Sequence, residues 1–259
     1  MSTTLGNVEI EEMTFAAAIK ATLAEEMRRD PAVFLMGEDI KYGVWGTTAG
    51  LQNEQPDRVL HLPISENGFC CAAVGAALTG MRPVVELMFA DFALLALDAL
   101  GNQAAKYRYM CGGDPFKVPM VVKLAGSGIG SGSGCHHSQT TEALFMHFPG
   151  LKVVTPSTPA EAKGLLASAI RDDNPVVFVE AKLLYPETGP VPKGDYTIPL
   201  GQAHIAREGT DITLVSHSYA LVKTLAAAES LAGEGISAEV ISLRTLVPLD
   251  KAAVLESVA

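Results

Sequence analysis

Short runs of consecutive apolar residues alternate with helical stretches from residue 13 to residue 179, and this alternation constrains the fold more than any other feature. A strand that is apolar at every position is buried on both faces, as in a parallel sheet covered by helices on both sides. We therefore predict an α/β domain with a mainly parallel sheet and helices on both faces. The predicted strands are 33–36, 59–64, 83–89, 118–124, 151–154 and 175–179, and the predicted helices are 13–29, 66–80, 93–109, 141–147 and 160–171.

The chain changes character at residues 186–200, where proline and glycine interrupt any periodicity. Such punctuation is typical of a connection, so we predict a linker there. Residues 1–185 then form the main α/β domain, and residues 201–259 form a smaller α/β domain. The second domain has predicted strands at 211–216 and 238–243, a helix at 219–232 and only the start of another helix, so we expect it to be incomplete.

One helix start is specified by local chemistry. Thr158 is suited to be an N-cap, Pro159 lies in the first turn, and Glu161 follows three residues after the cap. A capping hydroxyl and a first-turn proline are both typical of helix N-termini.

The charge balance and the apolar runs exclude several classes of partner. With 19 Lys and Arg against 29 Asp and Glu, the net charge is −10, which argues against binding to nucleic acid or an anionic membrane. The longest uncharged apolar run, 69–81, is shorter than the roughly 20 residues that cross a bilayer. The N-terminal residues 1–7 lack the pattern of a signal peptide. We interpret the four cysteines as reduced thiols and predict a cytoplasmic protein.

Glu66 is the first candidate for chemistry, because it lies where a predicted strand ends and a helix begins. In open α/β sheets, ligands bind beyond the carboxyl ends of the strands. The helix that follows is built of small residues, so it can pack closely and draw Glu66 into an apolar pocket, where a carboxyl can share or donate a proton. A first-turn glutamate that only complements the helix dipole is the alternative.

A glycine-rich loop at 126–134 and the histidines that follow it form the second candidate. The loop matches neither the P-loop nor the Rossmann glycine spacing, so we interpret it as a flexible active-site or surface loop. His136 and His137 are suited to proton transfer at neutral pH. Adjacent side chains point in different directions, so we expect one of the two at most to face a site, and a solvated loop histidine remains the alternative.

Two aromatic and basic positions complete the candidates. Phe92 follows another predicted strand end and could form the wall of a pocket for a flat ring, although packing in the core is the commoner role of such a residue. Arg108 lies on a polar helix face, where it could pair with an acid or a partner chain or be solvated.

Taken together, these residues resemble the β subunit of the E1 component of 2-oxo acid dehydrogenase complexes, with acetoin, pyruvate and branched-chain members all similar. The resemblance covers nearly the whole chain, and its specificity lies in the joint set of motifs. The segments that carry it are 39–51, 57–59, 63–68, 89–92, 105–109, 137–139, 148–154 and 156–159.

This resemblance implies a thiamine diphosphate enzyme of transketolase-like fold, in which residues 1–185 form the pyrimidine-binding domain and residues 201–259 a partial transketolase C-terminal domain. Glu66 would match the glutamate that hydrogen-bonds N1′ of the aminopyrimidine, and Phe92 the aromatic that stacks on it, with Ile64 beside them. His137 would match the histidine that handles protons while the acyl group passes to lipoamide. Asp172 and Asn174 fall where some relatives bind a structural potassium ion.

Two departures from the family pattern shape the expected partners. The chain has no G-D-G motif with a downstream asparagine, the pattern that binds Mg²⁺ and diphosphate, so the resemblance implies an E1 α subunit that supplies this half of the site in an α₂β₂ heterotetramer. The lipoyl domain and core of E2 would be further partners. The second domain stops before that of relatives, which leaves a fragment and a degenerate domain as alternatives and puts assembly and E2 docking in question.

The leading hypothesis is therefore an oxidoreductase of the 2-oxo acid dehydrogenase E1 type that is active only with its α subunit. A non-catalytic structural or regulatory subunit is the alternative from another class. A self-sufficient thiamine enzyme and a plain nucleotide-binding domain are opposed by the missing diphosphate motif and the failed glycine spacings.

Overall fold

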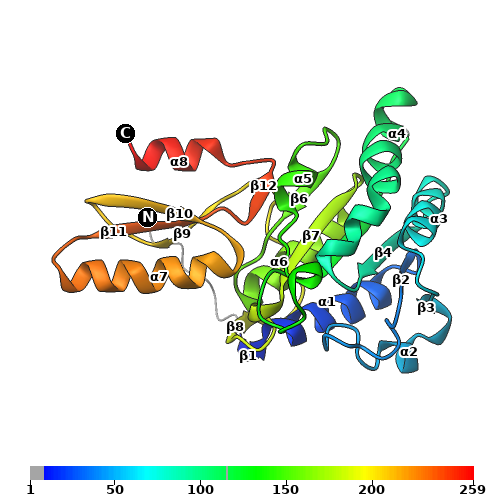
Figure 1. Ribbon diagram of the computed structural model, residues 1–259, viewed down its shortest axis with the longest axis horizontal. Helices are drawn as coiled ribbons and strands as arrows, with labels where there is room; N and C mark the ends of the chain where they lie inside the picture. The colour runs from blue at the N-terminus through cyan, green and yellow to red at the C-terminus, as the bar shows by residue number, and fades with distance from the viewer. Residues whose placement is uncertain (1–8, 115) are drawn as a thin grey trace.

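The computed structural model describes residues 9–114 and 116–259. Residues 1–7, in which the sequence shows no signal-peptide pattern, lie outside the described residues. A seven-stranded sheet with the order β12-β6-β7-β5-β4-β2-β3 forms the centre of the molecule (Figure 1). All neighbouring strands are parallel except β12, which is antiparallel to β6. The strands are β2 (Val33–Gly37), β3 (Val59–His61), β4 (Arg82–Leu87), β5 (Val121–Ser127), β6 (Lys152–Val154), β7 (Val176–Ala181) and β12 (Thr245–Val247).

Side chains of the central strands point alternately into two apolar cores, which explains why most positions of these strands are apolar. On β2, for example, Val33 and Leu35 pack with helices α1 (Phe15–Arg29) and α6 (Pro159–Arg171). Phe34 and Met36 pack on the other side with α3 (Glu66–Leu78) and the turns that follow β4. The predicted parallel sheet with helices on both faces is thus confirmed.

The single α-helix predicted over 93–109 is wrong. This stretch contains a 3₁₀ helix (Ala90–Ala96), a π-helix (Asp98–Ala104) and a short α4 (Ala105–Met110) in succession. Gly101 in the π-turn lies against the ring of Phe148, where a Cβ would come within 2.8 Å of ring carbons. The apolar periodicity is compatible with all three helix types, and tertiary packing of this kind decides between them.

The segment 186–200 lacks periodicity, as expected of a connection, yet the structure holds it firmly against the first domain. It contains β8 (Thr188–Pro192), which pairs antiparallel with β1 (Ile10–Thr14), a strand that the sequence analysis does not predict. Further along, the Tyr196 hydroxyl donates to the carbonyl of Ala160, and Ser168 Oγ donates to the carbonyl of Ile198. Both contacts fasten this connection to α6.

The C-terminal part contains a three-stranded sheet of order β10-β11-β9 with α7 (Ser218–Gly233) packed on it. Its strands are β9 (His204–Arg207), β10 (Ile212–Ser216) and β11 (Ala238–Ser242), and the last helix is α8 (Lys251–Ser257). The following strand, β12, leaves this sheet and joins the edge of the central one (Figure 1). There Arg244 Nε donates to Glu161 Oε1 at 2.8 Å, so the two domains are tied by a strand and an ion pair.

The remaining short helices are α2 (Leu51–Glu54) and α5 (Glu142–Met146). Within residues 9–114 and 116–259, no helix combines the length and apolarity needed to cross a bilayer. All four cysteines are free thiols.

Candidate active site

The side chains singled out in the sequence gather at one edge of the central sheet. Because β2, β3, β4, β5 and β7 are parallel, their carboxyl ends lie at the same edge, and the segments that follow them meet there. These segments supply Trp45, Glu66, Phe92, His137 and Tyr185 in chain order. This edge is therefore the place to look for a ligand site.

Glu66 is the first residue of α3 and its side chain is buried, with 5% of the residue exposed. Its carboxylate has no hydrogen bond or ion pair to any described residue, which leaves its oxygens available to a ligand. Glu38 lies close by at the end of β2, is also buried, and has an Oε2 atom without a partner. Burial, followed by the charges of Glu66 and Asp39, raises the pKa of Glu38. The charge of Glu66 therefore acts on a second buried carboxyl, Glu38, which the sequence analysis did not foresee.

Phe92 and His137 come from different strand ends and lie in contact in the structure. The His137 ring stands edge-on to Phe92, at 5.2 Å between ring centroids, and edge-on to Phe89 at 4.5 Å. Its Nδ1 atom is buried and has no hydrogen-bond partner. His136 is exposed, so only one of the adjacent histidines faces this cluster, as the sequence analysis expected.

Trp45 and Tyr185 extend the same aromatic cluster toward the sheet. Trp45 lies edge-on to Phe89 at 5.3 Å and 5.4 Å from Tyr185, and its Nε1 donates to the carbonyl of Met88 at 2.8 Å. Tyr185 is hydrogen-bonded on both sides: its hydroxyl donates to Glu180 and accepts from the backbone N–H of Gly126. The cluster thus forms a rigid apolar wall whose outer members are Phe92 and His137.

The α3 helix connects Glu66 to this wall. Phe69, Cys70 and Ala73 of α3 share one apolar core with Ala90 and Ala93, which flank Phe92 in the 3₁₀ helix. The small residues of α3 allow this close packing, as the sequence analysis anticipated. Ile64, by contrast, is 82% exposed.

Comparison with known proteins assigns the chain to a family. The transketolase pyrimidine-binding domain matches residues 11–188, and the transketolase C-terminal domain matches residues 201–259. The chain is 47% identical, over 95% of its length and 76% of the relative, to the β subunit of acetoin:2,6-dichlorophenolindophenol oxidoreductase from Cupriavidus necator. With the same shares covered, it is 44% identical to the 2-oxoisovalerate dehydrogenase β subunit of Bacillus subtilis. The chain belongs to the E1 β-subunit family of 2-oxo acid and acetoin dehydrogenases.

The structural comparison agrees on the fold. A split-gene transketolase, described as an inactive β4 tetramer, matches with a TM-score of 0.78 at 24% identity, over 95% of this chain and 76% of that one. The transketolase-like fold and the family predicted from the sequence are therefore confirmed. Enzymes of the E1 family are oxidoreductases that depend on thiamine diphosphate, and the site just described faces the open edge of the domain named for binding the pyrimidine of that cofactor.

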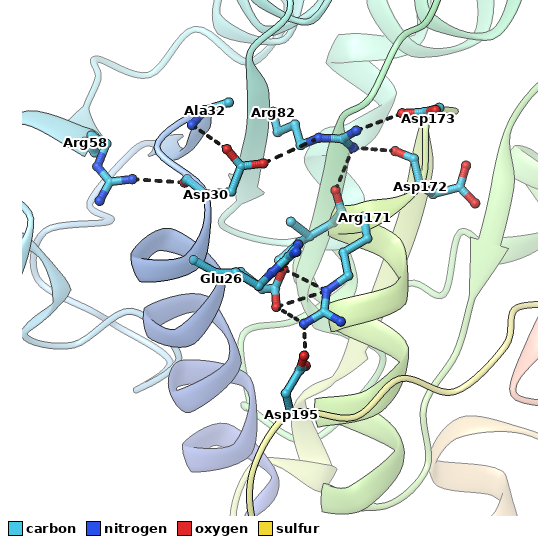
Figure 2. Close-up of polar contacts among 11 residues, drawn as sticks. Glu26, Asp30, Ala32, Arg58, Arg82, Arg171, Asp172, Asp173 and Asp195 are labelled. Carbon is cyan, nitrogen blue, oxygen red and sulfur yellow. Dashed lines mark hydrogen bonds and ion pairs between the residues drawn. The ribbon is translucent and has the colours of Figure 1, made fainter.

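The E1 β resemblance also predicts a potassium site at Asp172 and Asn174, and the structure gives both side chains protein partners. The Asp172 carboxylate pairs with Lys152 and accepts from the backbone N–H of Asn174, while Asn174 Oδ1 accepts from Arg108 at 2.5 Å. Figure 2 shows Arg82 beside this turn. Its guanidinium donates to the carbonyls of Asp172 at 3.0 Å and Ile170 at 3.1 Å.

Several residues at this edge of the sheet were not singled out in the sequence analysis, among them Glu38, Asp91 and Lys182. Glu38 and Lys182 directly follow buried strands, and Asp91 is one residue from Phe92, so position alone could have flagged them. Asp91 is 5% exposed and accepts from both the backbone and side-chain N–H of Gln139. Lys182, 6% exposed, contacts the segment that carries His137.

Proposed function

We propose that this chain is the β subunit of a thiamine diphosphate-dependent E1 2-oxo acid or acetoin dehydrogenase and provides the pyrimidine half of the cofactor site. The observation that supports this best is the buried Glu66 carboxylate, which has no protein partner and opens a closely packed helix beside an aromatic wall. The carboxylate oxygens of Glu66 are not among the fully buried polar atoms that lack a partner, so a ligand can reach them. The N1′ atom of an aminopyrimidine would share a proton with this carboxylate.

The residues of this chain take the following roles. The Glu66 carboxyl holds a proton against N1′, the Phe92 ring stacks on the aminopyrimidine, and Ile64 lies at the rim. His137, fixed between Phe89 and Phe92, moves a proton at its ring nitrogen while the acyl group passes to lipoamide. When bound, thiamine diphosphate supplies the carbon nucleophile and the electron sink for decarboxylation.

An E1 α subunit is the partner that completes the site. This chain lacks the diphosphate-binding motif, so diphosphate and Mg²⁺ would be held by the α subunit in an α₂β₂ assembly. Exposed apolar side chains occur just before Glu66 and in the segment that follows β2: Ile64 is 82%, Tyr42 65% and Val44 56% exposed. Large exposed apolar side chains of this kind are typical of protein interfaces. The lipoyl domain of E2, a cytoplasmic location and the potassium ion at Asp172 and Asn174 belong to the same proposal.

Calorimetry tests the shared site directly. Thiamine diphosphate with Mg²⁺ is titrated into this chain alone, into the E1 α subunit alone and into the mixture. Binding only in the mixture supports the proposal. Tight binding to this chain alone would mean that the diphosphate site has been misplaced and that the two-subunit assignment is wrong.

Turnover of a 2-oxo acid or acetoin with an artificial electron acceptor tests the role of Glu66. Glu66→Gln in the assembled enzyme is expected to abolish turnover, because glutamine cannot hold the proton at N1′. Glu229→Gln is the matched control, since the Glu229 side chain is 84% exposed on α7, away from the site. Normal turnover by Glu66→Gln would contradict the proposal.

A further inference from the structure

The glycine-rich stretch 126–134 runs from the end of β5 toward His137. Its local sequence does not restrict the backbone to one conformation. Gly126, Gly128, Gly130, Gly132 and Gly134 all have positive φ angles, between 59° and 121°. Glycine reaches such angles at little steric cost but loses more conformational entropy than any other residue when it is fixed. A loop of this kind cannot by itself hold the His137 ring in one place, so contacts from elsewhere must do so.

Lys182 provides those contacts. It follows β7 directly and is 6% exposed. Its Nζ atom donates to the carbonyl of His137 at 2.5 Å and to Ser131 Oγ at 3.2 Å. One buried ammonium therefore ties the middle of the glycine-rich loop to its end, from a strand end 45 residues further along the chain.

The residue after Lys182 holds the loop at a third point. A Cβ built on Gly130 would lie 2.5 Å from Cδ2 of Leu183, so the loop backbone packs directly on the Leu183 side chain. Gly130 also has a φ of +121°, which L side chains rarely adopt. Consecutive residues at the end of β7 thus grip the loop through one apolar and two polar contacts.

Most of the contacts of the Lys182 ammonium are with the loop and the aromatic cluster of this chain. Two of its donors are used by the loop, and the Phe89 ring lies 5.2 Å from Nζ, within range of a cation–π contact. Burial lowers the pKa of Lys182, and the nearby charge of Asp91 opposes that shift. Asp91 in turn accepts hydrogen bonds from Gln139, two residues after His137. Lys182 and Asp91 therefore both bind the segment that carries His137.

We infer that Lys182 is a positioning residue: it clasps the glycine-rich loop and thereby fixes the backbone from which the His137 ring projects between Phe89 and Phe92. Its effect on turnover rests on the function proposed above for His137. Its effect on the order of the loop does not, because the contacts lie entirely within this chain.

The test compares Lys182→Met with Lys182→Arg, and uses Lys251→Met, at an exposed position on α8, as the control. Hydrogen exchange of the backbone amides at 128–138 is measured on the assembled enzyme. Lys182→Met is expected to speed this exchange about tenfold or more, the change that follows from losing a charge-assisted hydrogen bond. Lys182→Arg should restore part of the protection, and Lys251→Met should leave it unchanged.

Steady-state kinetics of the same variants separate positioning from substrate binding. Lys182→Met should lower kcat with little change in KM, and Lys182→Arg should recover part of it. Unchanged exchange in Lys182→Met would overturn the inference, as would a raised KM with normal kcat, which would identify a substrate-binding cation. If Lys182→Met does not fold, Ser131→Ala removes one of the two contacts at an exposed position and should give a smaller increase in exchange.

Failure of the proposed function gives a different result from failure of the clasp. If the wild-type assembly shows no 2-oxo acid or acetoin turnover while Lys182→Met still loosens the loop, the clasp stands and the assigned reaction falls. If wild-type turnover is normal and Lys182→Met leaves hydrogen exchange of the loop unchanged, the inference about Lys182 is wrong and the assigned reaction stands.

Discussion

Replacing Lys123 by methionine tests how the buried ion pairs of the central sheet stabilise the protein. Lys123 lies on β5 with 1% of its side chain exposed, and its Nζ is 2.6 Å from Glu86 on β4 and 3.2 Å from Glu180 on β7. Burial opposes its charge, but the attraction of Glu180 and Glu86 outweighs burial and raises the pKa of Lys123. The Tyr185 hydroxyl donates a hydrogen bond to Glu180 and so stabilises its carboxylate.

Methionine keeps most of the volume of lysine and removes the cation, so Lys123→Met leaves two buried carboxylates without a counter-charge. Breaking a buried ion pair from one side typically costs about 3–5 kcal/mol. For a protein of this size, such a loss lowers the melting temperature by roughly 6–20 °C. Urea unfolding at neutral pH, followed by fluorescence, measures the change in the free energy of unfolding.

The pH dependence of the loss in Lys123→Met identifies its cause. Burial already raises the pKa of Glu180, and removing Lys123 takes away the charge that opposes this shift. For an acid whose pKa is higher in the folded state than in the unfolded state, the free energy of unfolding falls as the pH rises above the unfolded-state pKa. The variant should therefore recover stability as the pH is lowered toward the range where the buried carboxyls protonate. Adding Glu86→Gln and Glu180→Gln to Lys123→Met should recover it at neutral pH.

Lys163→Met is the matched control. The Lys163 side chain on α6 is also buried, at 3% exposure, but its single partner Glu25 is 39% exposed and keeps its hydration when the lysine is lost. We expect a loss of no more than about 1 kcal/mol, as for an exposed pair. A similarly small loss in Lys123→Met, or a loss that is the same at acidic and neutral pH, would refute the reasoning.

Three further predictions follow from the site and the fold. Burial raises the pKa of Glu38, so Glu38→Gln should stabilise the isolated chain near about pH 8 and much less near about pH 4, as denaturant midpoints at the two pH values would show. Thr158 caps α6 by accepting from the backbone N–H of Glu161 at 3.2 Å, so Thr158→Ala should cost about 1 kcal/mol in urea unfolding; no loss would contradict the cap. Phe92→Ala should weaken thiamine diphosphate binding in the assembled enzyme roughly tenfold by calorimetry through loss of ring stacking, and unchanged affinity would remove Phe92 from the site.

The sequence shows that some buried charges need partners, but it does not show which residues those partners are. Glu86, Lys123 and Glu180 each interrupt an otherwise apolar strand, and a charge in such a strand must find a partner. Which charge meets which depends on the strand order, because β5 lies between β4 and β7. The prediction of a single helix over 93–109 failed for a related reason, since the π-turn at Gly101 reflects its contact with Phe148, far along the chain.

The sequence by itself determined the local features of this protein. Strands buried on both faces are apolar at most positions, so the α/β layers were predictable. The N-cap at Thr158 was also predictable, because all the interacting atoms lie within one turn. The position of Glu66 at a strand end was equally predictable, and the family followed from the joint set of motifs.

Only the tertiary structure decided which distant segments meet. It paired β1 with β8, took β12 out of the C-terminal sheet into the central one, and placed Lys182 on the loop that carries His137. Each of these contacts joins residues that are dozens of positions apart in the sequence. Their energies come from burial and hydrogen bonding that exist only after the sheet has assembled, so no local pattern of residues specifies them.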